Sequence, residues 1–73
     1  MKKLIPFDPA VFSYGERVTI LKWGIPGLVQ AFYSENGRYM VTAMRCEMPA
    51  EEAAKHKGAI VFLELLPEEI KSL

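Results

Sequence analysis

The chain has one thiol and one imidazole, at Cys46 and His56, and these are the side chains that could form a nucleophile with its general base. The surrounding sequence favours a structural role for each. A cysteine at the end of a strand is usually a small buried apolar residue. His56 lies between Lys55 and Lys57, where basic residues suit the negative end of a helix dipole. We therefore predict that the protein is not an enzyme, with a Cys46–His56 dyad as the least favoured alternative.

The same residue types predict no metal site and no cofactor. Zinc sites usually need about four Cys or His ligands, and the chain has one residue of each type. The adjacent glutamates at 51–52 and 68–69 fall in the expected first turns of helices, where the dipole stabilises acidic residues. Neighbouring helical residues also point about 100° apart, so neither pair converges on one target. The five glycines match no phosphate-binding motif, and we assign all of them to turns.

Two arginines and several aromatic residues are candidates for a binding surface. Like Lys22, Arg17 and Arg38 lie near the ends of expected strands, and these three basic residues could join Trp23 and Tyr39 in a patch for nucleic acid. The overall charge does not support this hypothesis, because nine basic residues are balanced by nine acidic ones. Ordinary solvent-facing positions on the strands explain the arginines as well, and we favour that interpretation.

Length and composition predict a single soluble domain over residues 1–73. A chain this short buries only roughly 60% of its unfolded surface, and 51% of its residues are apolar. Some apolar surface is therefore expected to stay outside the core, which predicts a protein partner or a homo-oligomer. A lone cysteine favours a cytoplasmic location. Prolines at 6 and 9 interrupt the apolar run of a signal peptide, and no run is long enough for a membrane helix.

The spacing of apolar residues predicts a mainly β fold. Prolines punctuate residues 1–12, which are expected to form an extended N-terminal arm. Alternation predicts strands at 16–23, 28–34 and 38–46, with a turn at 24–27 and an Asn-Gly turn at 35–37. On the third of these strands, Tyr39, Val41 and Ala43 share one side. Three such consecutive strands make an antiparallel meander.

The second half of the chain predicts a helix and another strand. Within residues 48–58, Pro49 suits the first helical position, acids follow it, and bases and Gly58 end it, which predicts about two to three turns. The apolar run at 59–66 predicts a strand, and its length favours a central strand over a buried helix. Left uncovered, this strand would be the main aggregation hazard of the chain. Pro67 and the acids after it predict a short helical turn.

The layout resembles small SH3-like barrels of the KOW and Tudor kind. The resemblance rests on residues 14–20, 27–29, 37–41 and 62–66, where a Gly-acid-base-Val strand is followed by a glycine return and a closing Phe-Leu strand. It implies a barrel of four to five strands, in which the helix expected within residues 48–58 would be an insertion before the last strand that the simplest barrels lack. An open antiparallel meander with a helix packed on it is the alternative. The resemblance also implies a binding module, because such barrels bind peptides, nucleic acid or other subunits through aromatic residues near loop ends.

Several residues are candidates for the contact surface that the resemblance implies. Core packing is the favoured alternative for the tyrosines, whereas contact and core roles are weighed equally for the tryptophan. A partner is expected to bind the second face of the meander, which would include Val29 and Met40, or the exposed edge of the last strand. The candidate partner-binding residues are Trp23, Tyr14, Tyr33, Tyr39, Leu21, Arg17 and Arg38.

The sequence as a whole predicts a small non-catalytic protein-binding module. An accessory subunit, an adaptor or an inhibitor fits this size, and mobile elements often carry such modules. A nucleic-acid-binding SH3-like barrel is the alternative, and it would require a basic face in the folded chain.

Overall fold

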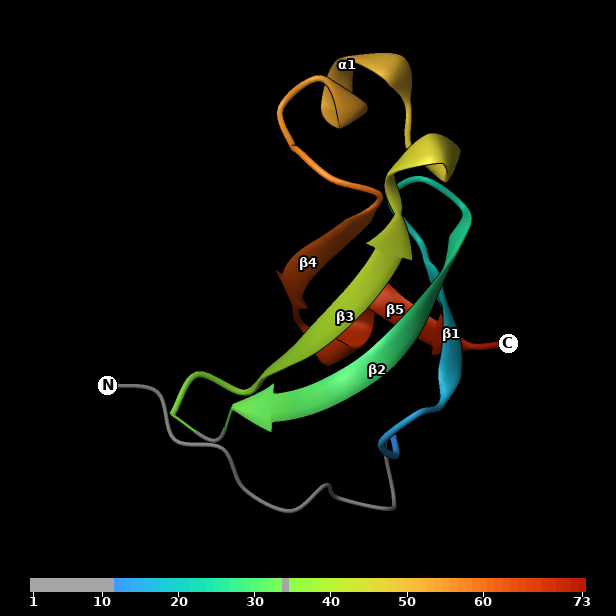
Figure 1. The fold of residues 1–73 in the computed structure, drawn as a ribbon. Coiled ribbons are helices and arrows are strands. Elements are labelled where there is room, and N and C mark those ends of the chain that lie inside the picture. The colour runs from blue at the N-terminus through green and yellow to red at the C-terminus, as the bar shows by residue number, and fades with distance from the viewer. Residues whose placement is uncertain (1–11, 34) are drawn as a thin grey trace.

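Alternating apolar residues fold this chain into one open antiparallel sheet, which Figure 1 shows in a computed structural model. The structure describes residues 12–33 and 35–73, so the predicted arm lies outside the described residues except for its last residue, Phe12. The sheet order is β4-β3-β2-β1-β5. The mainly β fold class is confirmed. The strands are β1 (Arg17–Ile20), β2 (Ile25–Tyr33), β3 (Arg38–Met44), β4 (Ile60–Leu65) and β5 (Ile70–Ser72); the short helix is α1 (Ala50–Ala53), and the 3-10 turns are η1 (Arg45–Glu47) and η2 (Pro67–Glu69).

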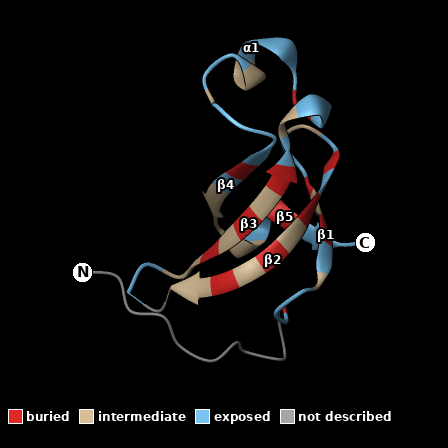
Figure 2. Ribbon diagram, in the orientation of Figure 1, coloured by how far each residue is buried: buried red, intermediate tan, exposed pale blue. Residues whose placement is uncertain are grey.

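One side of the sheet carries the core. On β3, Tyr39, Val41 and Ala43 are buried and alternate with half-buried residues, as predicted (Figure 2). The ring of Tyr39 is central: Phe12 meets it edge-on at 5.3 Å between centroids, and Phe32 lies 4.8 Å away. The other buried apolar side chains come from every strand and from the segment before α1: Val18, Ile20, Ile25, Val29, Ala31, Met48, Val61 and Ile70.

The Asn36–Gly37 turn forms as predicted and sets the register of β2 against β3. Gly37 has a φ of 68°, and its N–H donates to the Tyr33 carbonyl at 2.9 Å. The Asn36 side-chain oxygen accepts the Arg38 N–H at 3.0 Å. Tyr33 pairs with Arg38 as a result, and the pairing continues to Leu28 opposite Thr42 with one irregularity between Val29 and Ala31.

The first turn lies earlier than predicted. The chain reverses at residues 21–24, so the predicted strand 16–23 ends at Ile20 and the predicted turn at 24–27 is wrong. Gly24 explains the position, because its φ of 68° suits a reversal and its N–H donates to the Ile20 carbonyl at 2.7 Å. Pro26 lies inside β2, before the pairing with β3 begins at Leu28, so its missing N–H breaks no recorded pairing with β3.

The helix is shorter than predicted. Only Ala50–Ala53 is α-helical, so the prediction of two to three turns is wrong. No residue of α1 is buried, and a short helix needs a packed face to persist in water. The Arg45 guanidinium Nε donates to the Ala53 carbonyl at 2.9 Å and holds this single turn against η1.

The position of β4 also differs from the prediction. It pairs with β3 alone among the described residues, so it is an edge strand, and the predicted central position is wrong. The reason lies further along the chain: residues 70–72 form β5, a strand that the sequence did not predict, and β5 pairs with β1.

The sheet must curl strongly for the chain to run from β4 to β5. These strands occupy opposite edges of the sheet, about 19 Å apart if the sheet were flat. Only Leu66 and the three residues of η2 join them, and a 3-10 turn advances about 2 Å per residue.

Among the described residues, no helix is both long enough and apolar enough to cross a membrane.

Candidate functional site

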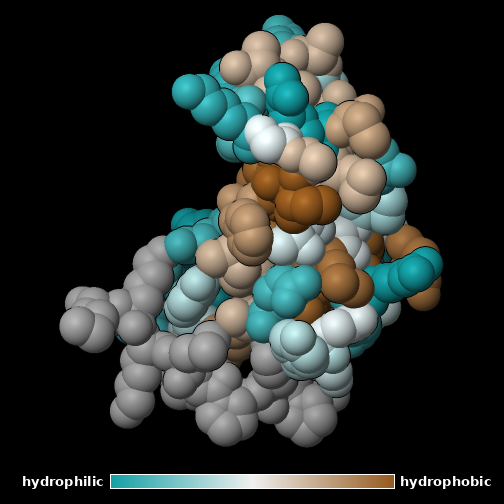
Figure 3. All heavy atoms as spheres, viewed as in Figure 1, coloured by the Kyte–Doolittle hydropathy of each residue, from teal (hydrophilic) through white to brown (hydrophobic). Residues whose placement is uncertain are grey.

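The side of the sheet opposite the core, here called the outer face, exposes apolar side chains. It is built from the residues that alternate with the buried ones, and cross-strand pairing brings them together: Met44 lies opposite Ile60, and Thr42 opposite Phe62. Met44 is 47% exposed, Ile60 45% and Phe62 65%. Figure 3 shows hydrophobic side chains gathered over β2, β3 and β4 on this face. Large exposed apolar groups clustered in this way are typical of interaction surfaces.

A hollow of about 370 Å³ lies on the outer face. Apolar side chains of β2, β3 and β4 dominate its lining, among them Leu28, Met44 and Ile60, and Leu73 closes it from the C-terminal end. Arg17 and Glu47 add one charge of each sign to the lining. The hollow can therefore accept an apolar group, with a charged or polar neighbour on either side.

Polar side chains brace this face without closing it. The Thr42 hydroxyl donates to the Leu28 carbonyl at 3.4 Å, and Gln30 Nε2 donates to the same hydroxyl at 3.5 Å. These contacts join β2 to β3 beside the hollow. Most of the lining is consequently held by strands, with Glu47 in η1 and Leu73 after β5 as exceptions, which favours a preformed surface.

Tyr39 is not available for contact. It is 1% exposed at the centre of the core, so the alternative of core packing holds for it. Val29, which the sequence placed on the second face, is also fully buried. The irregular pairing between Val29 and Ala31 shifts the alternation along β2, and the sequence alone gives no sign of that shift.

Tyr33 is half-buried at the end of β2, and three other candidates lie in turns. Trp23 is half-buried in the 21–24 turn, where it packs against the core cluster and Lys22 Nζ lies 5.4 Å from its ring centroid. Leu21 in the same turn is 51% exposed. Tyr14 is 70% exposed in the turn before β1, at the opposite end of that strand. The structure thus does not bring these three candidates together.

The two arginine candidates also lie apart. Arg38 pairs with Tyr33, and its guanidinium Nη1 donates to the Glu64 carbonyl at 3.4 Å. Arg17 lies on β1, two strands away from Arg38, and pairs with Leu28 of β2. Strand spacing and rise place the backbones of Arg17 and Arg38 about 17 Å from each other. The two arginines therefore do not form one basic patch.

Cys46 and His56, the candidate nucleophile and base, lie in separate segments. Cys46 is exposed in η1, contrary to the expected buried position, and His56 is half-buried after α1. No hydrogen bond between them is recorded among residues 12–33 and 35–73. Within the same residues, no cluster of three His, Cys, Asp or Glu side chains could hold a metal ion.

From the sequence we expect a partner on the second face of the meander, with Met40 there, but this expectation misses the most exposed apolar residues of the outer face. Met44, Ile60 and Phe62 are not among its candidates, because the sequence predicts that the run 59–66 is a central strand that its neighbours cover. One signal was present: even-numbered residues of this run and of β3 fall on the same face once the strands pair. Comparison of the chain with protein-family models, with curated proteins and with solved structures found no match.

Proposed function

We propose that this chain is a non-catalytic protein-binding module, serving as an accessory subunit, adaptor or inhibitor. The observation that carries the proposal is the exposed apolar outer face with its hollow beside Leu28, Met44 and Ile60. A partner segment that inserts an apolar side chain there would bury surface that the core leaves exposed. The single, exposed thiol of Cys46 supports a reducing, cytoplasmic location for this activity.

We further propose that the module is a small SH3-like barrel, and the strand order supports this proposal. A four-strand meander is followed by a 3-10 turn and a short fifth strand that pairs with β1. This arrangement is compatible with the barrel layout that the sequence resembles. In such modules the sheet is a scaffold, and the partner surface is set by the residues that decorate it.

The test compares three immobilised proteins as baits in extracts of the native host, with bound proteins quantified by mass spectrometry. The baits are the unaltered chain, Met44→Lys and Leu21→Lys. Met44→Lys places a charge in the lining of the hollow, whereas Leu21 is equally exposed but lies outside that lining. We expect one partner that the unaltered chain and Leu21→Lys retain and Met44→Lys loses.

Other outcomes would overturn the proposal in distinct ways. A partner lost only with Leu21→Lys would move the binding surface to the 21–24 turn. Retention of nucleic acid that salt releases, and that an additional Arg17→Glu bait fails to retain, would favour the nucleic-acid-binding barrel instead. Binding that none of the variants changes would remove the outer face from the explanation.

A further inference from the structure

The outer edge of β4 has backbone groups available for pairing. The Arg45 N–H donates to the Ala59 carbonyl at 2.8 Å, so these two residues form a hydrogen-bonded pair. Along the antiparallel strands β3 and β4, hydrogen-bonded pairs alternate with non-hydrogen-bonded pairs. Odd-numbered residues of β4 therefore direct their N–H and C=O groups toward β3, and even-numbered ones direct them outward. Ile60 and Phe62 thus present their backbone groups at this edge, and the described residues offer no strand to meet them.

Apart from the charge of Glu64, β4 itself carries few of the features that usually protect a sheet edge. Within its six residues, IVFLEL, there is no proline and no lysine, and no irregularity interrupts its pairing with β3. The opposite edge is formed by β5, which has only three residues and includes Lys71. Arg38 partly shields β4, because it donates to the Glu64 carbonyl. A carbonyl has two lone pairs, so this contact does not prevent a second bond.

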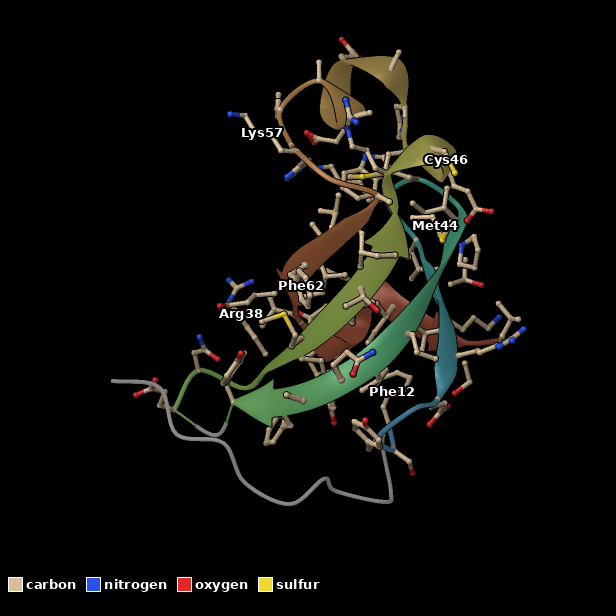
Figure 4. All side chains as sticks on the ribbon, viewed as in Figure 1. Phe12, Arg38, Met44, Cys46, Lys57 and Phe62 are labelled. Carbon is tan, nitrogen blue, oxygen red and sulfur yellow. The ribbon has the colours of Figure 1, made fainter. Side chains whose placement is uncertain are left out.

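Charges at the two ends of β4 are opposite in sign. Lys57 precedes the strand and Glu68 follows it; both are exposed, and no ion pair with a described residue is recorded for either. Figure 4 shows Lys57, Phe62 and Arg38 on the same side of the molecule. When an edge strand pairs antiparallel with an identical copy, its beginning lies beside the end of its partner. That arrangement brings the basic end of each copy to the acidic end of the other.

From these observations we propose that β4 pairs antiparallel with β4 of a second copy of this chain, around a two-fold axis at Phe62. Each Phe62 then exchanges backbone hydrogen bonds with Phe62 of the other copy, and Ile60 pairs with Glu64. The two sheets become continuous across the axis, and the two outer faces join into one surface. This pairing uses the backbone groups of the edge; the side chain of Ile60 also lines the hollow, but the pairing does not depend on the proposed binding function.

The first test measures the mass of the full chain in solution by sedimentation equilibrium over a range of concentrations. We expect a dimer for the unaltered chain. In Phe62→Lys two like charges would face each other at the axis, and we expect the dissociation constant to rise at least about tenfold. Met44→Lys is the matched control, because Met44 is an exposed apolar residue of the same face that lies on β3, away from the edge. It is expected to dimerise like the unaltered chain.

A second test reports the register. In a Cys46→Ser background, Phe62→Cys places two thiols across a hydrogen-bonded pair, where Cα atoms are about 5.5 Å apart and a disulfide fits. Mild oxidation is expected to give a covalent dimer. Glu64→Cys in the same background is the control, since its Cα atoms in the two copies would be about 13 Å apart along the strands. It is expected to stay uncrosslinked.

A charge exchange tests the antiparallel direction. Lys57→Glu and Glu68→Lys are each expected to weaken self-association, whereas an equal mixture of the two is expected to restore it as a mixed dimer. The unaltered circular dichroism spectrum of each variant would show that the fold is intact.

Three results would overturn the proposal. They are a monomer at all concentrations, loss of the dimer in Met44→Lys as well as in Phe62→Lys, or crosslinking of Glu64→Cys in place of Phe62→Cys. The second of these would indicate stacking of the outer faces. A monomer would leave the proposed function intact, because a different protein could still bind the hollow.

Discussion

At the scale of single residues, position 27 requires glycine because a side chain would not fit there, and not because the backbone adopts a positive φ. The other four glycines have φ values of 68–86° and serve turns, but Gly27 lies inside β2 and is not among the positive-φ residues. A Cβ added there would lie 2.6 Å from Val41 Cγ1 and 3.2 Å from Ile20 Cδ1. The assignment of all five glycines to turns is therefore wrong at this position.

Gly27→Ala is consequently expected to destabilise the fold by about 1–3 kcal/mol through overpacking. Denaturant unfolding of the variant measures this change in the free energy of unfolding. Val41→Ala provides the control, because it removes the methyl group that the new Cβ would meet. We expect Gly27→Ala to cost less in the Val41→Ala background, and equal costs in both backgrounds would contradict a steric cause.

At the scale of elements, the side chain of Glu16 ties the turn before β1 to β5. Its carboxylate accepts hydrogen bonds from the Ser72 hydroxyl and, at 2.9 Å, from the Ser13 N–H. The Ser72 bond first and the Ser13 bond second lower the pKa of Glu16 below its ordinary value of 4.5. A carboxyl with a lowered folded-state pKa stabilises the fold above its ordinary value, and this stabilisation is lost as pH falls through the lowered pKa.

Glu16→Gln is therefore expected to be less stable than the unaltered chain near neutral pH, with a difference that shrinks as pH falls below 4.5. Unfolding curves of both proteins across that range measure the difference. Ser72→Ala removes the larger cause, so it is expected to raise the pKa of Glu16 in an NMR titration. A stability difference that stays constant with pH would show that the carboxylate charge plays no part.

Elements specified by local residues were predictable from the sequence. The Asn36–Gly37 turn and the buried side of β3 depend on neighbouring residues alone, and both form as predicted. The lengths of β1 and α1 were not predictable in this way. The first depends on where Gly24 reverses the chain, and the second on whether another element packs against the alanines.

Features that depend on distant parts of the chain could not be predicted. An apolar run such as 59–66 has the same sequence pattern in a central strand and in an edge strand. It lies at an edge here because β5 pairs with β1 at the other side of the sheet and not with β4. The same limit applies to the candidate surface. Phe62 is 65% exposed because no described strand lies beyond β4, whereas Tyr39 is buried because aromatic rings from two other segments enclose it.

At the scale of the whole molecule, one glutamate helps to hold the curled sheet together. The Glu69 carboxylate accepts the Leu66 N–H at 2.6 Å, which fixes η2 directly after β4. The Glu69 carbonyl accepts the Leu21 N–H at 3.0 Å, which joins η2 to the turn after β1. The next residue, Ile70, is buried and pairs with Ile20. Through these contacts η2 connects the two edges of the sheet.

Glu69→Ala is expected to lower the free energy of unfolding by about 1–2 kcal/mol, because the Leu66 N–H loses a charged acceptor in a partly buried place. In a chain of this size the melting temperature would fall by roughly 5–15 °C. Glu68→Ala is the matched control, since Glu68 lies in the same turn but is exposed, and a change within about 0.5 kcal/mol is expected there. Equal losses for both variants would mean that acidic charge in the first turn, and not the Leu66 contact, sets the stability of η2. A loss confined to Glu69→Ala, with faster amide exchange in both β4 and β5, would show that this contact holds both edges of the sheet in place.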